Sequence, residues 1–172
     1  MFAVREGGAQ RTGVILTTPG ATVRKFADTG DVQGPILSQN LEAGLTAVRP
    51  LVPKAANRTY TVNLVGSMQG YEWAMRSSAD LLLRQGERVI VEMRNHSMMA
   101  HPMHLHGHHF QIVAINGQEI SGAVRDTVFL PPMTSIAFAF DAINPGKAWA
   151  FHCHHLYHMA TGMMAAVGYE GG

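Results

Sequence analysis

The sequence predicts an all-β protein, built as a sandwich or barrel of short antiparallel strands. Three observations support this class. Runs that alternate large apolar residues with small or polar ones recur along the chain, and Gly and Pro turn signals separate them. No segment carries a strong helical period, because the weak period over residues 37–48 is interrupted by Gly44.

The first strands of this series are predicted from their alternation and their turns. In residues 60–66 (YTVNLVG), Val62 and Leu64 would share one face of a strand, and polar residues would share the other. Residues 88–95 (RVIVEMRN) follow a Gly-containing turn. Residues 109–118 end in an Asn-Gly pair, which is typical of a hairpin turn.

Four later runs complete the series. Residues 124–132 (VRDTVFLPP) end at two prolines, and residues 134–142 (TSIAFAFDA) alternate large and small side chains. Residues 148–155 (AWAFHCHH) follow an Asn-Pro-Gly turn, and residues 163–170 (MMAAVGYE) form the last predicted strand. This spacing of short strands favours a sandwich or a barrel.

The N-terminal third differs in composition from the rest. Residues 1–16 offer one or two strands, whereas residues 17–53 contain four prolines and several glycines and read as a connection. A long connection of this kind argues against a single compact domain. We therefore predict the end of a preceding domain over residues 1–20, a linker over residues 21–57 and a complete domain over residues 58–172.

Composition limits the classes of partner. Of the 172 residues, 47% are hydrophobic and only 15% are charged, and the net charge is +1. This balance gives no electrostatic reason to expect nucleic acid or an anionic membrane as a partner. No apolar run is long enough to span a bilayer. The single cysteine excludes an internal disulfide.

Nine of the ten histidines lie in two short clusters, HPMHLHGHHF at residues 101–110 and FHCHHLYHMATGMM at residues 151–164. On a strand, successive side chains face opposite ways, so His152 and His154 would point to one side and Cys153 to the other. One strand would then serve two metal sites, one on each face.

Cysteine, two histidines and a weak axial methionine make a blue-copper electron-transfer site. Cys153, His158 and Met163 supply three of these ligands, and His101 in the first cluster can face the same side as the cysteine. Structural zinc sites usually carry paired cysteines, and an inert core cysteine would not explain the regular histidine spacing around it.

The second face would hold a different kind of site. His104 and His106 would share a face of their own strand, on the side of His152 and His154. One metal ion rarely needs four imidazoles, so this group indicates a multinuclear site.

The motifs H-P-M-H-L-H-G-H and H-C-H-x-x-x-H-x-x-x-x-M resemble the two C-terminal copper signatures of the multicopper oxidases, the laccase and copper-resistance oxidase family. Neighbouring segments are similar too: RNHSMMAHPMHLHGH, DTVFLPP and PGKAWAFHCHHLYHM. The resemblance covers residues 58–172, and FAVREGGAQRTGVILTTPG more weakly resembles the tail of the family's preceding domain. It implies a Greek-key cupredoxin fold for residues 58–172.

The resemblance also implies roles for the histidines and the cysteine. In the family, electrons from the substrate enter at type 1 copper and pass through the cysteine and its flanking histidines to a trinuclear cluster, which reduces oxygen to water. The positions that match type 1 ligands are His101, Cys153, His158 and Met163, the type 2 ligand is His104, and the type 3 ligands are His106, His152 and His154.

The ligand set for the trinuclear cluster is incomplete in this chain, because the family's two further His-x-His pairs from its first domain are missing. We therefore expect the chain alone to be inactive as an oxidase. Its expected partners are the N-terminal cupredoxin domains of a longer protein, oxygen, and a small-molecule or Cu(I) substrate. We expect that protein to be bacterial, linked to copper resistance, and periplasmic or secreted. Two alternatives stay open: a stand-alone blue-copper electron carrier and a copper-storage module.

Overall fold

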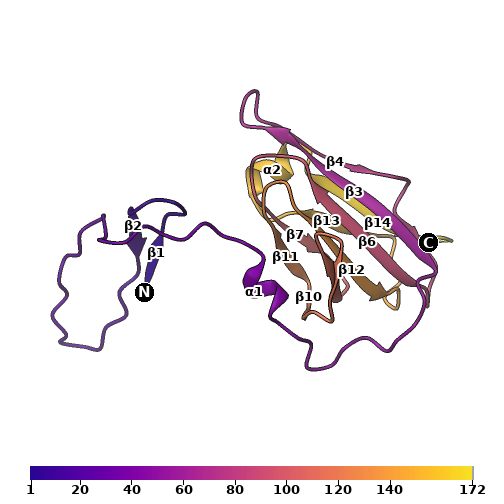
Figure 1. The fold of residues 1–172 in the computed structure, drawn as a ribbon, viewed down its shortest axis with the longest axis horizontal. Coiled ribbons are helices and arrows are strands. Elements are labelled where there is room, and N and C mark those ends of the chain that lie inside the picture. The colour runs from indigo at the N-terminus through magenta and orange to yellow at the C-terminus, as the bar shows by residue number, and fades with distance from the viewer. Residues whose placement is uncertain (172) are drawn as a thin grey trace. The chain divides into compact units, whose positions relative to one another are not determined.

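The computed structural model describes residues 1–171 and divides into two compact units, residues 1–38 and a second unit that begins at Gln39. The first unit contains two short antiparallel strands, β1 (Phe2–Val4) and β2 (Arg11–Gly13), and the rest of it is loop (Figure 1). The linker predicted over residues 21–57 is divided between the two units. The assignment of residues 1–20 to a preceding domain stays a prediction.

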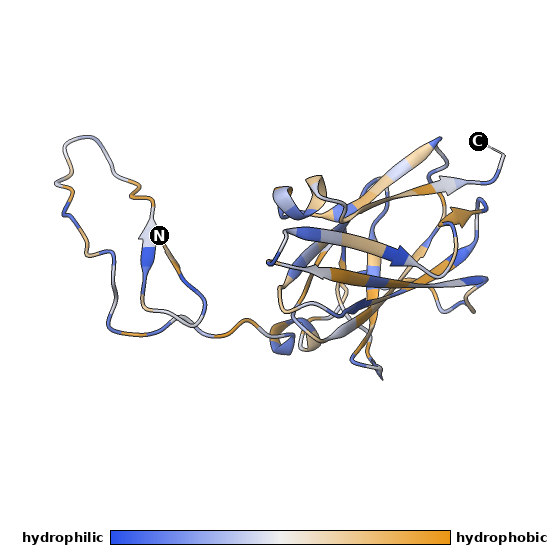
Figure 2. Ribbon diagram, turned by 90° about the horizontal axis from the view of Figure 1, so that it is seen from above, coloured by the Kyte–Doolittle hydropathy of each residue, from blue (hydrophilic) through white to orange (hydrophobic). Residues whose placement is uncertain are grey.

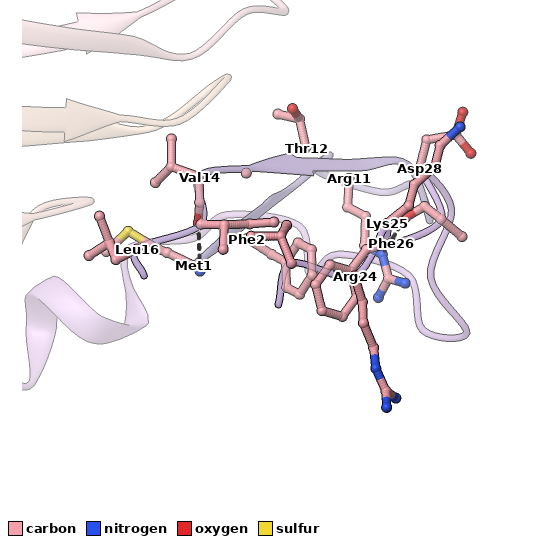
Figure 3. Close-up of a pocket in the computed structure, with 14 residues that line it drawn as sticks. Met1, Phe2, Arg11, Thr12, Val14, Leu16, Arg24, Lys25, Phe26 and Asp28 are labelled. Atoms are coloured by element: carbon pink, nitrogen blue, oxygen red, sulfur yellow. Dashed lines mark hydrogen bonds between the residues drawn. The ribbon is translucent and has the colours of Figure 1, made fainter. Parts of the chain in front are cut away.

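The first unit encloses a hollow of about 750 Å³ between β2 and the loop that contains Phe26 (Figure 3). Phe2 and Phe26 meet edge to face there, and the guanidinium carbon of Arg11 lies 4.9 Å from the centre of the Phe2 ring. Neither histidine nor cysteine lines this hollow.

The second unit is a sandwich of two β-sheets (Figure 1). One sheet has the strand order β10-β8-β12-β6-β3-β4, with β9 paired to β8, and the other has the order β11-β7-β13-β14-β5. The strands of the first sheet are β3 (Arg58–Ser67), β4 (Glu72–Ser77), β6 (Arg88–Asn95), β8 (Phe110–Ile115), β9 (Gln118–Glu119), β10 (Val124–Arg125) and β12 (Ser135–Asp141). The second sheet contains β5 (Leu82–Leu83), β7 (His101–Leu105), β11 (Thr127–Leu130), β13 (Ala148–Cys153) and β14 (Met164–Tyr169).

Alternation along the strands builds the core between the two sheets. Val62 and Leu64 of β3 are fully buried, and so are Ile136 and Phe138 of β12. In Figure 2 hydrophobic and hydrophilic segments alternate along the strands of this unit. The prediction of an all-β sandwich is therefore confirmed, because period-two patterns placed large apolar residues on one face of each strand.

Two details of the sequence-based prediction were wrong. Pairing is not antiparallel throughout, because β3 pairs with β6 and β14 pairs with β5 in parallel. The single strand predicted over residues 124–132 is broken at Asp126, so that β10 and β11 belong to different sheets. Local alternation cannot show that the chain crosses from one sheet to the other.

Helices play a small part in the described chain. The weak period over residues 37–48 corresponds to α1 (Asn40–Ala43), which ends at Gly44. A second short helix, α2 (Leu156–Ala160), follows directly after β13. Among residues 1–171 no helix has the length and apolar character that crossing a bilayer requires.

Residues 39–57 belong to the sandwich through specific polar contacts. Glu42 of α1 lies 3.1 Å from the guanidinium of Arg125, and the backbone N–H of Leu51 donates to Gln111 Oε1 at 2.8 Å. The buried guanidinium of Arg88 donates to the Val52 carbonyl at 3.0 Å. This segment is therefore fastened along the sheet that contains β6 and β8.

Candidate metal centre

Strands β7 and β13 carry the two histidine clusters, and they are neighbours in one sheet. They pair antiparallel with His152 opposite His104 and Cys153 opposite Met103. Because residues opposite each other in a ladder point to the same face, this register divides the clusters between the two faces of the sheet. The inner face, which looks into the sandwich, carries Cys153 and also His101, two positions before Met103.

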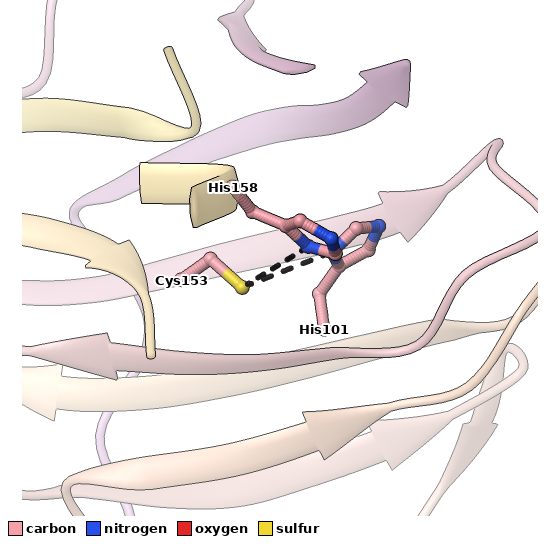
Figure 4. A group of neighbouring side chains, drawn as sticks. All are labelled: His101, Cys153 and His158. Carbon is pink, nitrogen blue, oxygen red and sulfur yellow. Dashed lines mark hydrogen bonds between the residues drawn. The ribbon is translucent and has the colours of Figure 1, made fainter. Parts of the chain in front are cut away.

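The inner group consists of His101, Cys153 and His158, and all three side chains are buried. Their ligand atoms lie within 4.8 Å of one another. The Cys153 Sγ atom is 3.8 Å from His101 Nδ1 and 3.9 Å from His158 Nδ1, and these two nitrogen atoms are 3.1 Å apart. Figure 4 shows the two rings and the thiol pointing toward one another.

The turn after β13 brings His158 and Met163 back to the inner face. Helix α2 buries His158 and leaves Leu156 and Tyr157 exposed. Gly162 has a φ of +123°, and a Cβ at this position would lie 2.4 Å from the Trp73 carbonyl oxygen. Only glycine avoids this clash, and the chain can therefore turn so that the Met163 carbonyl accepts from the Cys153 N–H at 3.1 Å.

Met163, the predicted axial ligand, is fully buried behind this turn. Its backbone carbonyl accepts from the Cys153 N–H at 3.1 Å, and its backbone N–H donates to the His158 carbonyl at 2.9 Å. The backbone therefore fixes Met163 next to two members of the inner group. Its role as a ligand stays a prediction.

Burial controls the protonation of the inner group. Desolvation, with a smaller contribution from the charges of His158 and His155, lowers the pKa of His101 to about 4. Burial also lowers the pKa of His158 and raises the pKa of the Cys153 thiol to about 11. The backbone N–H of His155 donates to Cys153 Sγ at 3.4 Å and lowers the pKa of the thiol by a smaller amount. At neutral pH the imidazoles are therefore neutral and can bind a metal, while the thiol must lose a proton to do so.

Aromatic residues from the β3–β4 hairpin cover the inner group. The Trp73 ring stacks on His158, with 4.1 Å between ring centroids, and meets His101 edge-on at 5.2 Å. Tyr71 lies edge-on to both Trp73 and His158. Trp73 is buried, so this hairpin keeps water away from the two imidazoles.

The outer face gathers the four remaining predicted ligands. His106 Nε2 lies 3.0 Å from His152 Nε2, and the His104 ring is 4.7 Å from the His106 ring and 5.0 Å from the His154 ring. His106 and His154 are exposed, and His104 and His152 are half-buried. The structure thus brings these four together on the face opposite Cys153, although their assignment to type 2 and type 3 copper stays a prediction.

Hydrogen bonds orient two of the outer rings. His104 Nδ1 contacts the Asp126 carbonyl and Thr127 Oγ1, both at 2.9 Å, and His152 Nδ1 contacts the Cys153 carbonyl at 3.0 Å. The Nε2 atoms of both rings are therefore turned toward the shared surface. The pKa of His106 is lowered, first by desolvation and then by the charges of His104, His152 and His154.

Other side chains near the sites carried a weaker sequence signal. His108 is buried and lies 2.8 Å from the Tyr169 hydroxyl and 3.1 Å from the His106 carbonyl. Trp73 and Ser97, which touch the inner imidazoles, were missed. Trp73 is distant in sequence and no spacing rule connects it to His158. Ser97 stands four residues before His101, but its burial is not visible in the sequence.

The donor atoms of the inner group fit copper. A thiolate is a soft ligand, two neutral imidazoles suit the same metal, and a thioether is the usual weak fourth ligand. All of these groups are buried behind Trp73, as a site that excludes solvent requires. The group His101, Cys153 and His158 could therefore hold one copper ion, with Met163 next to it in the chain fold.

Comparison with known proteins agrees with this chemistry. The sequence profile of the family described as "Multicopper oxidase" matches residues 46–171. Multicopper oxidase MmcO of Mycobacterium tuberculosis is 37% identical over 113 residues, which cover 63% of this chain and 22% of that protein. Copper resistance protein A of Escherichia coli is 36% identical over 118 residues, which cover 66% of this chain and 19% of that protein.

Solved structures show the same fold. The multicopper oxidase McoA from Aquifex aeolicus superposes with a TM-score of 0.58 at 25% identity, over 71% of this chain and 30% of that one. Residues of the sandwich therefore form a cupredoxin fold, as predicted. The chain spans about a fifth of the length of the curated relatives that it matches.

Proposed function

The chain belongs to the multicopper oxidase family, and from this premise we propose that it is the electron-accepting copper domain of an oxidoreductase that reduces oxygen to water. One observation carries the proposal: Cys153, which belongs to the buried group with His101 and His158, is next to His152 of the opposite face on strand β13. Copper bound by such a group supplies one-electron redox chemistry.

The inner residues would hold type 1 copper, with Met163 as the axial ligand. Cys153 would bind as the thiolate, so its raised pKa means that metal binding releases the thiol proton at neutral pH. His101 and His158 are already neutral there and lose no charge on binding. The rings of Trp73 and His158 are stacked, which holds the second imidazole in place.

Cys153 would also provide the route by which electrons leave the inner site. Its side chain and backbone connect Sγ by covalent bonds to His152 and His154, whose rings stand on the outer face. We propose His104 as a type 2 ligand and His106, His152 and His154 as type 3 ligands. Histidines from other cupredoxin domains of a longer protein would complete this cluster.

The names of two relatives support a proposal for the reducing substrate. Two of the matched proteins are a multicopper oxidase and a copper resistance protein, so we propose a role in copper resistance with Cu(I) or a small organic molecule as the electron donor. We propose a periplasmic or secreted location for the parent protein. Activity of the full-length protein toward Cu(I) and toward a phenol, compared under the same conditions, would separate a cuprous oxidase from a laccase.

The test of the inner site is a visible spectrum of the purified 172-residue chain after copper loading. We expect one copper per chain and an intense blue band. Cys153→Ser should abolish the band, because the thiolate that gives rise to it is gone. His104→Ala is the matched control on the other face and should leave the band nearly unchanged; its loss would contradict the two-sided assignment.

A stand-alone blue-copper electron carrier is the second candidate. It is favoured by one observation, that every predicted ligand of the inner site comes from this chain and is buried. Such a carrier would bind a single copper, exchange electrons reversibly with a small redox partner and consume no oxygen. Oxygen consumption restored by adding the other domains of the parent protein would exclude it.

A further inference from the structure

A buried side-chain hydroxyl contacts the ring nitrogen of His101 that points away from the cysteine. Ser97 lies in the loop between β6 and β7, and its Oγ is 2.7 Å from His101 Nε2. Ser97 is 1% exposed and His101 is fully buried, so water does not compete for this contact. The other ring nitrogen, Nδ1, is the one that faces Cys153.

Asn95 fixes the geometry around this hydroxyl. Its amide nitrogen lies against three backbone carbonyl oxygens, those of Met99, Leu130 and Pro131, at 2.7, 3.2 and 2.9 Å. Only an N–H donor is compatible with three acceptors, so the amide oxygen must point to the other side. There it accepts from the Ser97 backbone N–H at 2.9 Å and lies 2.8 Å from Ser97 Oγ.

These contacts determine where the hydroxyl hydrogen lies. Two oxygen atoms 2.8 Å apart repel unless a hydrogen lies between them, and Asn95 Oδ1 has none to give. The Ser97 hydroxyl therefore directs its one hydrogen to Asn95 Oδ1, with the Met99 carbonyl 3.1 Å away as the other acceptor, and has none for His101. Its lone pair then faces His101 Nε2, which must carry the hydrogen of that 2.7 Å contact.

We propose that Ser97, oriented by Asn95, is a positioning residue that selects the tautomer of His101. With its hydrogen on Nε2, His101 presents a bare Nδ1 to Cys153 and His158, which is the form that can bind a metal. The proposal deepens the proposed function, because it rests on His101 being a copper ligand.

The same logic assigns the hydrogen between the two imidazoles. His101 Nδ1 and His158 Nδ1 are 3.1 Å apart, so one of them carries a hydrogen in the metal-free chain. Because Ser97 places the His101 hydrogen on Nε2, the shared hydrogen belongs to His158 Nδ1. His101 would thus be ready for the metal, whereas His158 would have to move its hydrogen from Nδ1 to Nε2 before its Nδ1 could bind.

The first test needs no metal. Nitrogen-15 NMR of the metal-free full chain should show His101 with its hydrogen on Nε2 and His158 with its hydrogen on Nδ1. Since His101 is fully buried, its ring N–H should exchange slowly with solvent. A hydrogen on His101 Nδ1 would overturn the proposal, and this measurement on the natural chain does not depend on any variant folding.

The second test measures Cu(II) affinity in a matched set of variants. Ser97→Ala should weaken binding by about 10- to 100-fold, the usual cost of losing a partner of a metal-binding histidine. Ser97→Thr keeps the hydroxyl and should restore the affinity. Ser78→Ala is the control, because it also removes a hydroxyl, one that accepts from the Thr61 N–H at 3.1 Å and has no contact with Asn95 or Ser97. An affinity of Ser97→Ala equal to that of the control would overturn the proposal.

The two proposals fail in different ways. A natural chain that shows the expected tautomers and binds copper without a blue band would refute the type 1 assignment and leave the role of Ser97 in selecting the tautomer standing. A chain with the blue band and the opposite His101 tautomer would refute the role of Ser97 alone.

Discussion

Acidification should destabilise the metal-free chain through His101. Burial lowers the pKa of this imidazole from 6.5 to about 4 in the folded chain. The unfolded chain therefore takes up the proton first, so the stabilisation is complete above pH 6.5 and is lost as the pH falls to about 4. At about 1.4 kcal/mol for each pKa unit, acidification from pH 7 to pH 4 should cost about 3 kcal/mol.

The assay is urea unfolding of the metal-free chain at pH 7 and at pH 4. Carboxylates and other histidines also titrate over this interval, so the informative quantity is the difference between proteins. The natural chain should lose about 3 kcal/mol more than His101→Gln, which has no imidazole at this position. His96→Gln is the control for the replacement of histidine by glutamine, because His96 is exposed on the loop after β6.

The outcome that would refute this reasoning is an equal loss of unfolding free energy in His101→Gln and the natural chain. Equal losses would mean that His101 is protonated in the folded state at pH 4 without cost. The inner site would then be open to water at equilibrium, in conflict with the buried arrangement of His101 behind Trp73.

Three further substitutions test packing contacts and one ion pair by the free energy of urea unfolding at pH 7. Trp73→Ala should cost about 3–5 kcal/mol, because it removes a large buried ring, and a loss near zero would contradict its burial. Gly107→Ala should cost clearly more unfolding free energy than Gly117→Ala. Both glycines have a positive φ, but a Cβ at Gly107 would also lie 2.5 Å from the indole ring of Trp149. Equal losses would show that this ring moves aside. Asp141→Asn should cost about 2 kcal/mol by weakening the ion pair with the buried Arg88. That difference should vanish well below pH 4, where Asp141, whose pKa is lowered by Arg88, becomes protonated in both states; a difference that persists would assign the effect to packing.

Strands with a regular alternation and clear turns could be predicted from sequence. Residues 88–95 form β6 with the predicted bounds, and the Asn-Gly pair after β8 forms the hairpin turn to β9. Strand β4, at the edge of its sheet, was missed, because residues 72–77 (EWAMRS) contain only two large apolar side chains, Trp73 and Met75, too few for a clear alternation. Helix α2 has only five residues, too few for a helical period to be visible.

The candidate site was also predicted only in part. The spacing of histidines within each cluster predicted which side chains share a face, because alternation along a strand is local. The contact between His101 and Cys153 spans 52 positions and depends on the pairing of β7 with β13. The stacking of Trp73 on His158 depends on a hairpin from the opposite sheet. The contact of Ser97 with His101 depends on a loop conformation that Asn95 holds. Neither could be derived from a local pattern.

Because β7 pairs with β13, a change in the length of β13 affects the inner and the outer ligand group together. His152 lies opposite His104, and Cys153 opposite Met103, so one inserted residue within β13 ahead of Phe151 would turn Cys153 to the outer face and its flanking histidines to the inner face, while the histidines of β7 keep their faces. An insertion after His154 would instead lengthen only the loop that leads to His158. The length of the loop can therefore vary during evolution and alter the inner site alone. A single insertion or deletion in the strand pair would instead abolish metal binding by the inner group and by the outer group.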